Sequence, residues 1–194
     1  VEHDELLADL IVPHEAGHAV SLVERQVKLL RERNIDVRHR LNQLMDTARE
    51  NDRLFDKSRR LILGMLEAQS PDQVIATLED SLRTDFQVPH VSLILFTEAD
   101  RYSNAHCVTH AAAKEAIGHL LDSDKPLAGA LRPAELSFLF AESAEQVAST
   151  ALAPIRYQGL HGVLALGSED PQQYRSATGT LLLGYVADAL ARVL

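Results

Sequence analysis

The chain has a single cysteine, Cys107, no tryptophan and only two methionines. One thiol excludes an internal disulfide and any metal or redox site built from several cysteines, and it is typical of a protein in a reducing cytoplasm. No apolar run reaches the roughly 18 to 20 residues that a membrane-spanning helix needs, and no signal peptide is visible. The sequence therefore predicts a cytoplasmic protein without a membrane partner. Cys107 is expected to be a small buried side chain rather than a nucleophile.

Basic residues are scarce in the C-terminal part. Beyond position 66 there are 8 basic and 16 acidic residues, so this part carries most of the net charge of −9. Phosphate contacts need clustered lysine and arginine, which makes nucleic acid an unlikely partner there. Residues 20–66 carry 11 basic and 7 acidic residues. We interpret the basic group in this stretch as a solvated helix face, with contact to nucleic acid or lipid as the alternative; it comprises Arg31, Arg33, Arg38 and Arg40.

Proline is absent between Val20 and Gln69, and Gly64 is the only glycine there. Apolar residues recur over this stretch in steps of three and four, the heptad pattern of a helix with one apolar stripe. The pattern predicts one helix over residues 20–66, about 70 Å long at 1.5 Å per residue. Such a length favours self-association. The expected dimer interface is Val20, Val23, Val27, Leu30, Asn34, Val37, Leu41 and Leu44, and the stripe continues through Ala48, Asn51, Phe55, Ser58, Ile62 and Met65.

Two details of the stripe bear on how helices would pair. A lone asparagine at the position of Asn34 fixes the register of a parallel pair and favours two strands. Arg33 and Arg38 would face each other across such a pair, and like charges oppose it. We expect a parallel dimer, although antiparallel pairing stays open. The alternative is a helix folded back on its own domain, which a wider apolar face would permit; the additional residues are Leu22, Leu29, Leu54 and Leu61.

Residues 14–18 read His-Glu-Ala-Gly-His, which matches the H-E-x-x-H signature of zinc metalloproteases. In that signature two histidines one helical turn apart hold zinc and the glutamate, here Glu15, polarises its water. The context is missing: Gly17 weakens a helix, the extended H-x-x-G-x-x-H pattern is not met, and only 13 residues precede His14. We therefore expect no metal and no cofactor. A zinc hydrolase with His14, His18 and Glu24 as ligands is the alternative function.

Beyond residue 66 the pattern changes to alternating helices and strands. Ser70, Pro71 and Asp72 form a helix-start signal for a helix over residues 71–85. Strands are expected at 90–97, 105–109, 146–156 and 160–166, the last two joined by a tight turn at 157–159. Helices are expected at 111–121, 133–140 and 173–194, with a loop at 126–133. This order predicts an α+β domain in which an antiparallel sheet is flanked by helices.

The stretch from Leu152 to Gly167 resembles the late hairpin of GAF domains, in which an apolar-Pro strand, a Gly-bearing turn and a G-V-L strand precede a final helix. The wider chain is similar to the bacterial family called domain of unknown function 484, through residues 19–26, Asp85 and Phe86, and residues 167–171. The heptad pattern and this resemblance together predict three parts: an N-terminal segment (1–19), a long dimerising helix (20–66) and a GAF-like domain (67–194), the GAF likeness itself covering about residues 70–194. GAF domains bind small ligands or serve as dimerising relay modules.

The sequence lacks the residue patterns with which GAF domains bind their familiar ligands. The N-K-x-x-F-x-x-x-D-E pattern of cyclic-nucleotide binders is absent. Cys107 is followed by Val108 and lies in an expected strand, which does not match the usual bilin attachment site, and a single thiol argues against methionine sulfoxide reduction. By analogy with the fold, a pocket should lie between the sheet and residues 111–140. The candidate ligand-binding residues are Tyr102, His106, His110, Ser137, Ser149, Arg156 and Tyr157, with His161 beside them.

The sequence thus predicts a non-enzymatic cytoplasmic sensory or scaffolding module that dimerises through its N-terminal helix and binds an unidentified small molecule. The zinc hydrolase is the alternative from another class. A third interpretation is an interaction domain whose pocket is filled by its own side chains.

Overall fold

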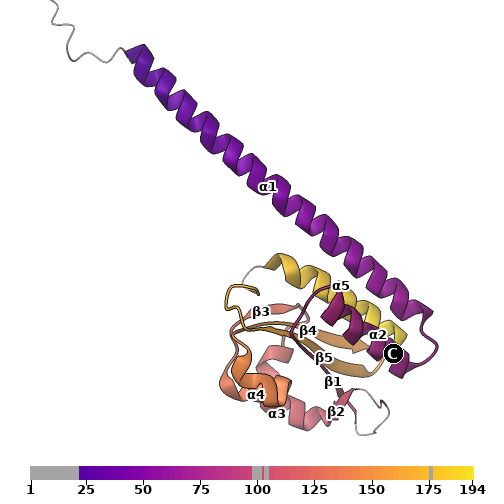
Figure 1. Cartoon of the computed structure of the whole chain (residues 1–194). Helices are drawn as coiled ribbons and strands as arrows, with labels where there is room; N and C mark the ends of the chain where they lie inside the picture. Colours follow the sequence, from indigo (N-terminus) through magenta and orange to yellow (C-terminus); the bar gives the residue numbers. More distant parts are fainter. Residues whose placement is uncertain (1–21, 98–101, 103–104, 175–176) are drawn as a thin grey trace, which may run out of the picture. The chain divides into compact units, whose positions relative to one another are not determined.

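The computed structural model describes residues 22–97, 102, 105–174 and 177–194. The chain divides into two compact units, Val1–Arg49 and Glu50–Leu194. The described part of the first unit is helical throughout and belongs to α1 (Leu22–Glu67), which is drawn in indigo and purple in Figure 1. The absence of proline explains its continuity, because proline removes a backbone donor and clashes with the preceding turn. The helix predicted over residues 20–66 is confirmed over its described part.

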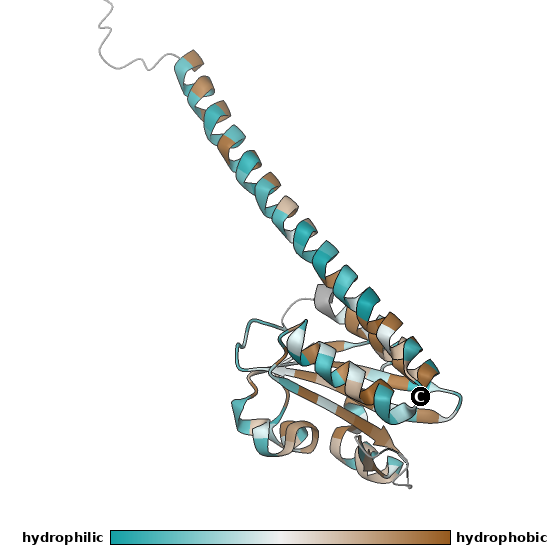
Figure 2. Ribbon diagram, turned by 45° about the vertical axis from the view of Figure 1, so that its right-hand side comes forward, coloured by the Kyte–Doolittle hydropathy of each residue, from teal (hydrophilic) through white to brown (hydrophobic). Residues whose placement is uncertain are grey.

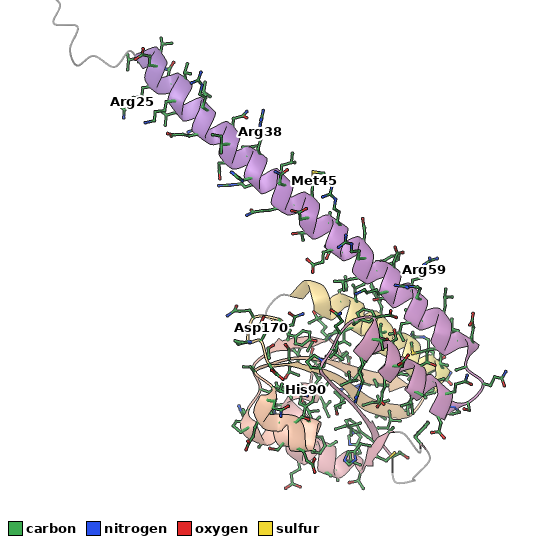
Figure 3. The ribbon with its side chains drawn as sticks, in the orientation of Figure 1. Arg25, Arg38, Met45, Arg59, His90 and Asp170 are labelled. Atoms are coloured by element: carbon green, nitrogen blue, oxygen red, sulfur yellow. The ribbon has the colours of Figure 1, made fainter. Side chains whose placement is uncertain are left out.

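The apolar stripe in the first unit is exposed to solvent. Val27 is 40 % exposed, Leu30 64 % and Leu44 68 %. Figure 2 shows brown, apolar bands at intervals along this mostly teal helix. Arg25, Arg38 and Met45 project outward from the same helix (Figure 3). The stripe therefore has the pattern of a surface that is buried by another helix, but in the single chain its side chains are solvated.

The second unit begins with the last turns of α1, followed by α2 (Pro71–Thr84). The predicted cap is confirmed, since the Ser70 hydroxyl accepts a hydrogen bond from the backbone N–H of Gln73 at 3.3 Å. Such a cap satisfies one of the donors that a helix leaves free at its start. Pro71 follows at the first helical position, where its fixed φ suits the helix and its missing N–H costs nothing.

A five-stranded sheet forms the centre of this unit, in the order β2-β1-β5-β4-β3. The strands are β1 (His90–Phe96), β2 (His106–Val108), β3 (Leu127–Gly129), β4 (Ser149–Tyr157) and β5 (Leu160–Ser168). β4 and β5 form the predicted hairpin, with Tyr157 opposite Leu160. The turn places Gln158 and Gly159 at positive φ, 44° and 90°. This turn geometry matches the right-handed twist of the two strands.

Two sequence predictions for the sheet were wrong. The sheet is mixed rather than antiparallel, because β2 runs parallel to β1 with Ile94 opposite His106. Three residues of β1, Ile94 to Phe96, are paired in this way. Residues 127–129, predicted as loop, form β3 and pair with β4. A three-residue edge strand leaves no periodic signal, since its position is fixed by the neighbouring strand rather than by its own pattern.

Helices cover both faces of the sheet (Figure 1). α2 and α5 (Ala177–Val193) lie on one face, and α3 (His110–Leu121) and α4 (Pro133–Phe140) on the other. A short 3₁₀ segment, η1 (Ala141–Gln146), leads from α4 toward β4. This is the α+β order that the sequence predicted, with each strand contributing alternate side chains to the two faces.

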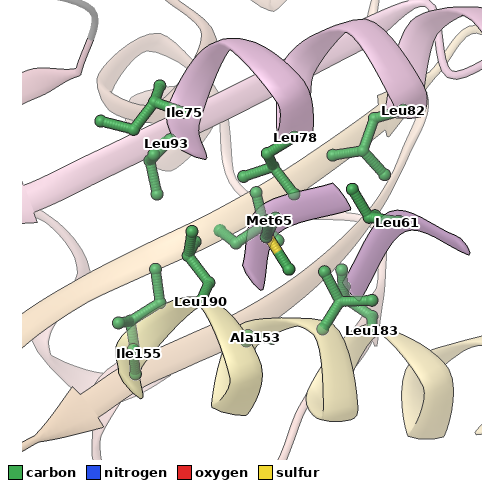
Figure 4. Packing of buried hydrophobic residues seen from close by; sticks show 14 of the residues in the cluster. Leu61, Met65, Ile75, Leu78, Leu82, Leu93, Ala153, Ile155, Leu183 and Leu190 are labelled. Carbon is green, nitrogen blue, oxygen red and sulfur yellow. The ribbon is translucent and has the colours of Figure 1, made fainter. Parts of the chain in front are cut away.

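Each face of the sheet has its own apolar core. On the α2–α5 face, Leu61 and Met65 of α1 pack among Ile75, Leu78 and Leu190, all at most 2 % exposed (Figure 4). On the α3–α4 face the buried cluster comprises Ile94, Ile117, Leu120, Leu139, Phe140, Val147, Leu152, Val163 and Ala165. Burying one such side chain contributes about 1.5–3 kcal/mol. The second cluster fills the centre of the space in which the sequence predicted a pocket.

Candidate functional site

A cavity of about 300 Å³ lies at the edge of the α3–α4 face, beside the end of the β4–β5 hairpin. It is formed by the C-terminal end of β1, one side of α3, the last residues of β4 and the first residues of β5. Its lining residues are Phe96, His110, Lys114, Gly118, Leu121, Asp122, Ile155, Arg156, His161 and Gly162. The volume is at the lower end of the range for small-molecule sites.

The local folding of these elements places the polar side chains. β4 and β5 are in register so that Arg156 and His161 are direct partners, and paired residues project from the same face of a sheet. On α3, His110 and Lys114 are four residues apart, which aligns them on one side of the helix. Gly118 follows a kink at Ile117, where φ is −133° and ψ is 19°, and lines the same cavity. Thr109 starts this helix by accepting a hydrogen bond from the N–H of Ala112 at 3.2 Å.

Three rings stand edge to face along the cavity. The centroids of Phe96 and His110 are 5.9 Å apart at an interplanar angle of 82°, and those of His110 and His161 are 5.7 Å apart at 88°. Edge-to-face contacts of this kind hold aromatic side chains in fixed orientations. The imidazole nitrogens of His110 and His161 make no hydrogen bond within the described part of the chain. The cavity therefore offers ring surface together with unoccupied donor or acceptor atoms.

Arg156 fastens the hairpin to the end of α3. Its guanidinium donates to the carboxylate of Asp124 and to the carbonyl oxygen of Leu121. Two contacts from one planar fork fix the position of the guanidinium more firmly than a single bond does. Lys114 makes no ion pair among the described residues. Within the described part of the chain, the lining thus combines the anchored guanidinium of Arg156 with the ammonium group of Lys114, which has no ion-pair partner there, and with the acidic residue Asp122.

The other predicted site residues lie elsewhere. Tyr102 is 8 % exposed and belongs to the core on the α2–α5 face, whereas His106 is exposed on β2. Ser137 donates to the carbonyl oxygen of Pro133 at 3.0 Å, and Ser149 donates to that of Asp170 at 2.6 Å. Tyr157 lies 5.0 Å below the guanidinium of Arg192. The structure therefore brings together His110, Arg156 and His161, and separates the remaining five.

Sequence reasoning missed seven of the ten lining residues, and Phe96 and Lys114 are the two of these that carry the ring contact and the ammonium group. Phe96 closes an apolar run and reads as an ordinary core residue of a strand. Lys114 reads as a solvated helix charge, although its spacing of four from His110 was a signal that the two share one side of α3. Both became visible only after the strand ends and α3 had been placed next to each other.

A buried carboxylate ties α3 to α4. Glu135 is 3 % exposed, and its Oε1 lies 3.0 Å from Nε2 of His119 on α3. Its Oε2 accepts a hydrogen bond from the backbone N–H of Arg132 at 2.9 Å, and Nε of Arg132 lies 3.7 Å from Oε1. Buried carboxylates persist when each oxygen has such partners. Oε1 of Glu135 therefore joins α4 to α3, while Oε2 caps the start of α4 itself.

A second polar pair occurs at the far end of the same face. His90 and Thr150 are both cross-strand partners of Gly167, and the His90 Nε2 and Thr150 Oγ1 atoms are buried without a hydrogen-bond partner within the described residues. A Cβ at Gly167 would lie 3.1 Å from Cε1 of Phe140 and 2.9 Å from Cγ2 of Val147. The space above the glycine is therefore occupied, and this pair offers no room for a ligand.

The metal motif lies outside the described residues. His14, Glu15 and His18 precede residue 22, whereas Glu24 is an exposed residue of α1. Among the described residues, no group of three or more His, Cys, Asp or Glu side chains is placed to hold a metal ion. Within the same residues, no helix has the length and apolar character required to cross a bilayer.

Comparison with protein families shows to which family the chain belongs. The model of the family "Protein of unknown function, DUF484" matches residues 1–194. The chain belongs to the DUF484 family. It is also similar to the uncharacterized protein YigA of Salmonella typhimurium (strain LT2), with 29 % identity over 188 residues, which are 94 % of this chain and 79 % of that protein.

Solved structures define the fold of this DUF484 protein. The GAF domain of a phosphoenolpyruvate-protein phosphotransferase from Acinetobacter matches with a TM-score of 0.55 at 16 % identity, over 72 % of this chain and 90 % of that domain. The corresponding domain from Coxiella burnetii gives 0.55 at 14 %, over 73 % and 92 %. The phycoerythrobilin-bound GAF domain of a cyanobacterial phytochrome gives 0.51 at 15 %, over 72 % and 93 %. The predicted GAF-like fold is confirmed.

Proposed function

We propose that this DUF484 protein is a non-enzymatic cytoplasmic sensory module that binds a small molecule in the cavity between α3 and the β4–β5 hairpin. The observation that carries the proposal is the convergence of His110, Lys114 and His161, whose polar atoms have no partner among the described residues, on one concave site. Concave sites with ring surfaces and a few convergent polar groups are the usual form of ligand pockets. The fold supports the class of function, since a GAF-like domain is typical of sensory and ligand-binding modules.

Packed side chains at the centre of the α3–α4 face restrict the positions that such a ligand could occupy. Ile117, Leu139 and Phe140 occupy the centre of the α3–α4 face with at most 8 % exposure. A ligand in that centre would have to displace packed side chains, at a cost of several kcal/mol. The edge cavity requires no such displacement. A compact ligand that contacts the rings of Phe96 and His161 and the ammonium group of Lys114 fits this site best.

Native mass spectrometry of the purified protein tests the proposal, because it reports any retained small molecule directly. Gly118→Leu fills the cavity without a backbone clash, since a Cβ at Gly118 would meet only Cγ of Lys114 at 3.4 Å. We expect the retained mass to disappear in this variant and to persist in Ala112→Leu, an exposed position on the same helix. A ligand that both variants retain equally would place the binding site elsewhere.

We also propose that the chain self-associates as a parallel dimer through the stripe on α1. The support is a row of exposed valine and leucine side chains at heptad spacing, including Val27, Val37 and Leu41, at 40 %, 62 % and 55 % exposure. Such a row is stabilised when a second helix buries it. Arg33 and Arg38 would oppose the pairing, so we expect the dimer to tighten as added salt screens them.

Sedimentation of the full chain tests self-association. Leu41→Asp places an unpaired charge in the stripe and should yield monomers, whereas Leu29→Asp, which is exposed but outside the stripe, should not. Asn34→Val should raise the melting temperature while it loosens the choice of oligomer. A wild-type chain that sediments as a monomer at micromolar concentration would refute the dimer.

A further inference from the structure

An apolar groove of about 230 Å³ lies within the second unit, between the last turns of α1 and the side of α5. Its walls are formed by Phe55, Ser58, Arg59, Ile62, Leu63, Leu182 and Tyr185. The groove belongs neither to the cavity beside α3 nor to the buried cores, since it opens on the outer surface of the two helices.

The groove is surrounded by large apolar side chains that remain in water. Phe55 is 59 % exposed, Leu181 60 % and Tyr185 55 %. Leu63 and Leu66 are exposed to a similar degree, at 48 % and 61 %. Together they expose on the order of 500 Å² of apolar surface, which is the size of patch that marks an interaction site on a soluble protein.

The heptad count along α1 explains why this face is open. Ser58 and Met65 occupy one column of the stripe and are buried in their own domain, at 4 % and 0 % exposure. Phe55 and Ile62 occupy the other column, the one that Val27 and Leu41 occupy earlier in the sequence. The domain therefore covers one column of the stripe in this stretch, and the other column borders the groove beside α5.

We propose that a second copy of this chain packs into the groove, so that α5 joins the dimer interface and the two copies of α1 and α5 form a four-helix contact at the domain. This inference rests on the self-association proposed above. In a parallel pair the two Phe55 side chains occupy equivalent positions and face each other, so the patch is complementary to itself.

The area of the patch agrees with a contact between two copies rather than with an independent binding site. Two patches would bury about 1,000 Å² in total, which is the lower limit for a stable interface. The patch alone is therefore marginal, but it becomes sufficient as the continuation of a paired helix. A different protein that bound here would have to gain its affinity from this small area alone, because it would not also pair with the stripe on α1.

Sedimentation of the full chain with a charge in the groove provides the test. Tyr185→Glu should weaken dimerisation by roughly tenfold or more, because burying a carboxylate in an apolar contact removes its hydration, which pairing with Arg59 of the same groove only partly offsets. Tyr157→Glu is the matched control, since Tyr157 is an exposed tyrosine at the hairpin, outside the groove. The control should dimerise like the wild type.

Comparing Tyr185→Glu with Leu41→Asp tests the groove separately from the stripe on α1, on which the groove proposal rests. If Leu41→Asp yields monomers while Tyr185→Glu dimerises normally, the groove is not part of the interface and the stripe is. If Tyr185→Glu yields monomers while Leu41→Asp dimerises, the groove is the interface and the stripe is not. A wild-type chain that stays monomeric at micromolar concentration overturns both proposals.

Cross-linking supplies a second measurement that does not depend on weakening the dimer. With Cys107→Ser as background, Phe55→Cys should form an intermolecular disulfide under mild oxidation, because equivalent positions of a parallel pair come within disulfide reach. Arg60→Cys, on the opposite side of α1, should remain reduced. Equal cross-linking at both positions, or none at Phe55→Cys, overturns the inference.

Discussion

Lys57 of α1 donates a hydrogen bond from Nζ to the backbone carbonyl oxygen of Asp85 at 2.5 Å, and the same ammonium lies 5.7 Å from the ring centroid of Phe86. Asp85 is the C-cap of α2, where the last carbonyl groups have no partner inside the helix. An ammonium at this position satisfies one of these oxygens and interacts favourably with the helix dipole. One side chain thereby fastens α1 to the end of α2.

Replacing this lysine should loosen the attachment. Lys57→Met keeps most of the aliphatic stem but removes the donor, and we expect a loss of about 1–2 kcal/mol in the free energy of unfolding. Urea unfolding followed by circular dichroism measures the loss. Lys28→Met, on the exposed part of α1, should change the free energy by less than about 0.5 kcal/mol. Equal effects of the two substitutions would show that the contact contributes nothing.

Glu135 should be a stabilising residue despite its burial. Glu135→Ala removes the partner of His119 and of the Arg132 backbone N–H, and we expect a loss of about 2–3 kcal/mol. Glu142→Ala, an exposed glutamate in η1, serves as the control and should be close to neutral. A Glu135→Ala protein as stable as the control would mean that the cost of burying the carboxylate cancels the gain from its contacts.

Gly162 should tolerate no side chain. A Cβ at this position would lie 2.6 Å from the carbonyl oxygen of Ile94, a backbone atom that cannot move without disturbing the β1–β5 ladder. We expect Gly162→Ala to cost more than about 2 kcal/mol. Gly118→Ala is the matched control, because its Cβ would make ordinary contact and alanine favours a helix by about 1 kcal/mol over glycine. Thermal unfolding of the two variants should therefore shift in opposite directions.

The raised pKa of Tyr174 leads us to expect that the free energy of unfolding falls at alkaline pH. Burial raises the pKa of Tyr174 from 10.0 to about 12. The unfolded chain therefore loses this proton first as the pH rises, so the stabilising contribution is fully present below the unfolded value and is lost between pH 10.0 and about 12. Urea unfolding across this range should show a steeper decline for wild type than for Tyr174→Phe. Parallel declines would contradict the assignment.

The elements that could be predicted from the sequence are those specified by residues within one segment. The uninterrupted heptad stripe predicted α1, the Ser70 cap with Pro71 predicted α2, and the turn at Gln158 and Gly159 predicted the hairpin. Each of these signals lies within one segment. The direction of β2 and the existence of β3 depend on which strands they meet, and three residues carry too little pattern to decide that.

The candidate site was predictable only in part for the same reason. His110, Arg156 and His161 were chosen because polar residues at strand ends and loop starts often reach a pocket, and these three do line one. Tyr102 and Ser149 met the same criterion but face the opposite side of the sheet or a loop carbonyl. The side of the sheet to which a strand-end residue projects depends on the exact end of the strand, which sequence patterns leave uncertain by a few residues.

The two outermost strands of the sheet, β2 and β3, have three residues each. An edge this short presents few unpaired backbone donors and acceptors, so a second sheet finds little to extend. Long, flat edges are the usual starting points for amyloid-like stacking. The long strand β5 pairs with β1 on one side and with β4 on the other, so its backbone is kept in the interior of the sheet, away from such contacts.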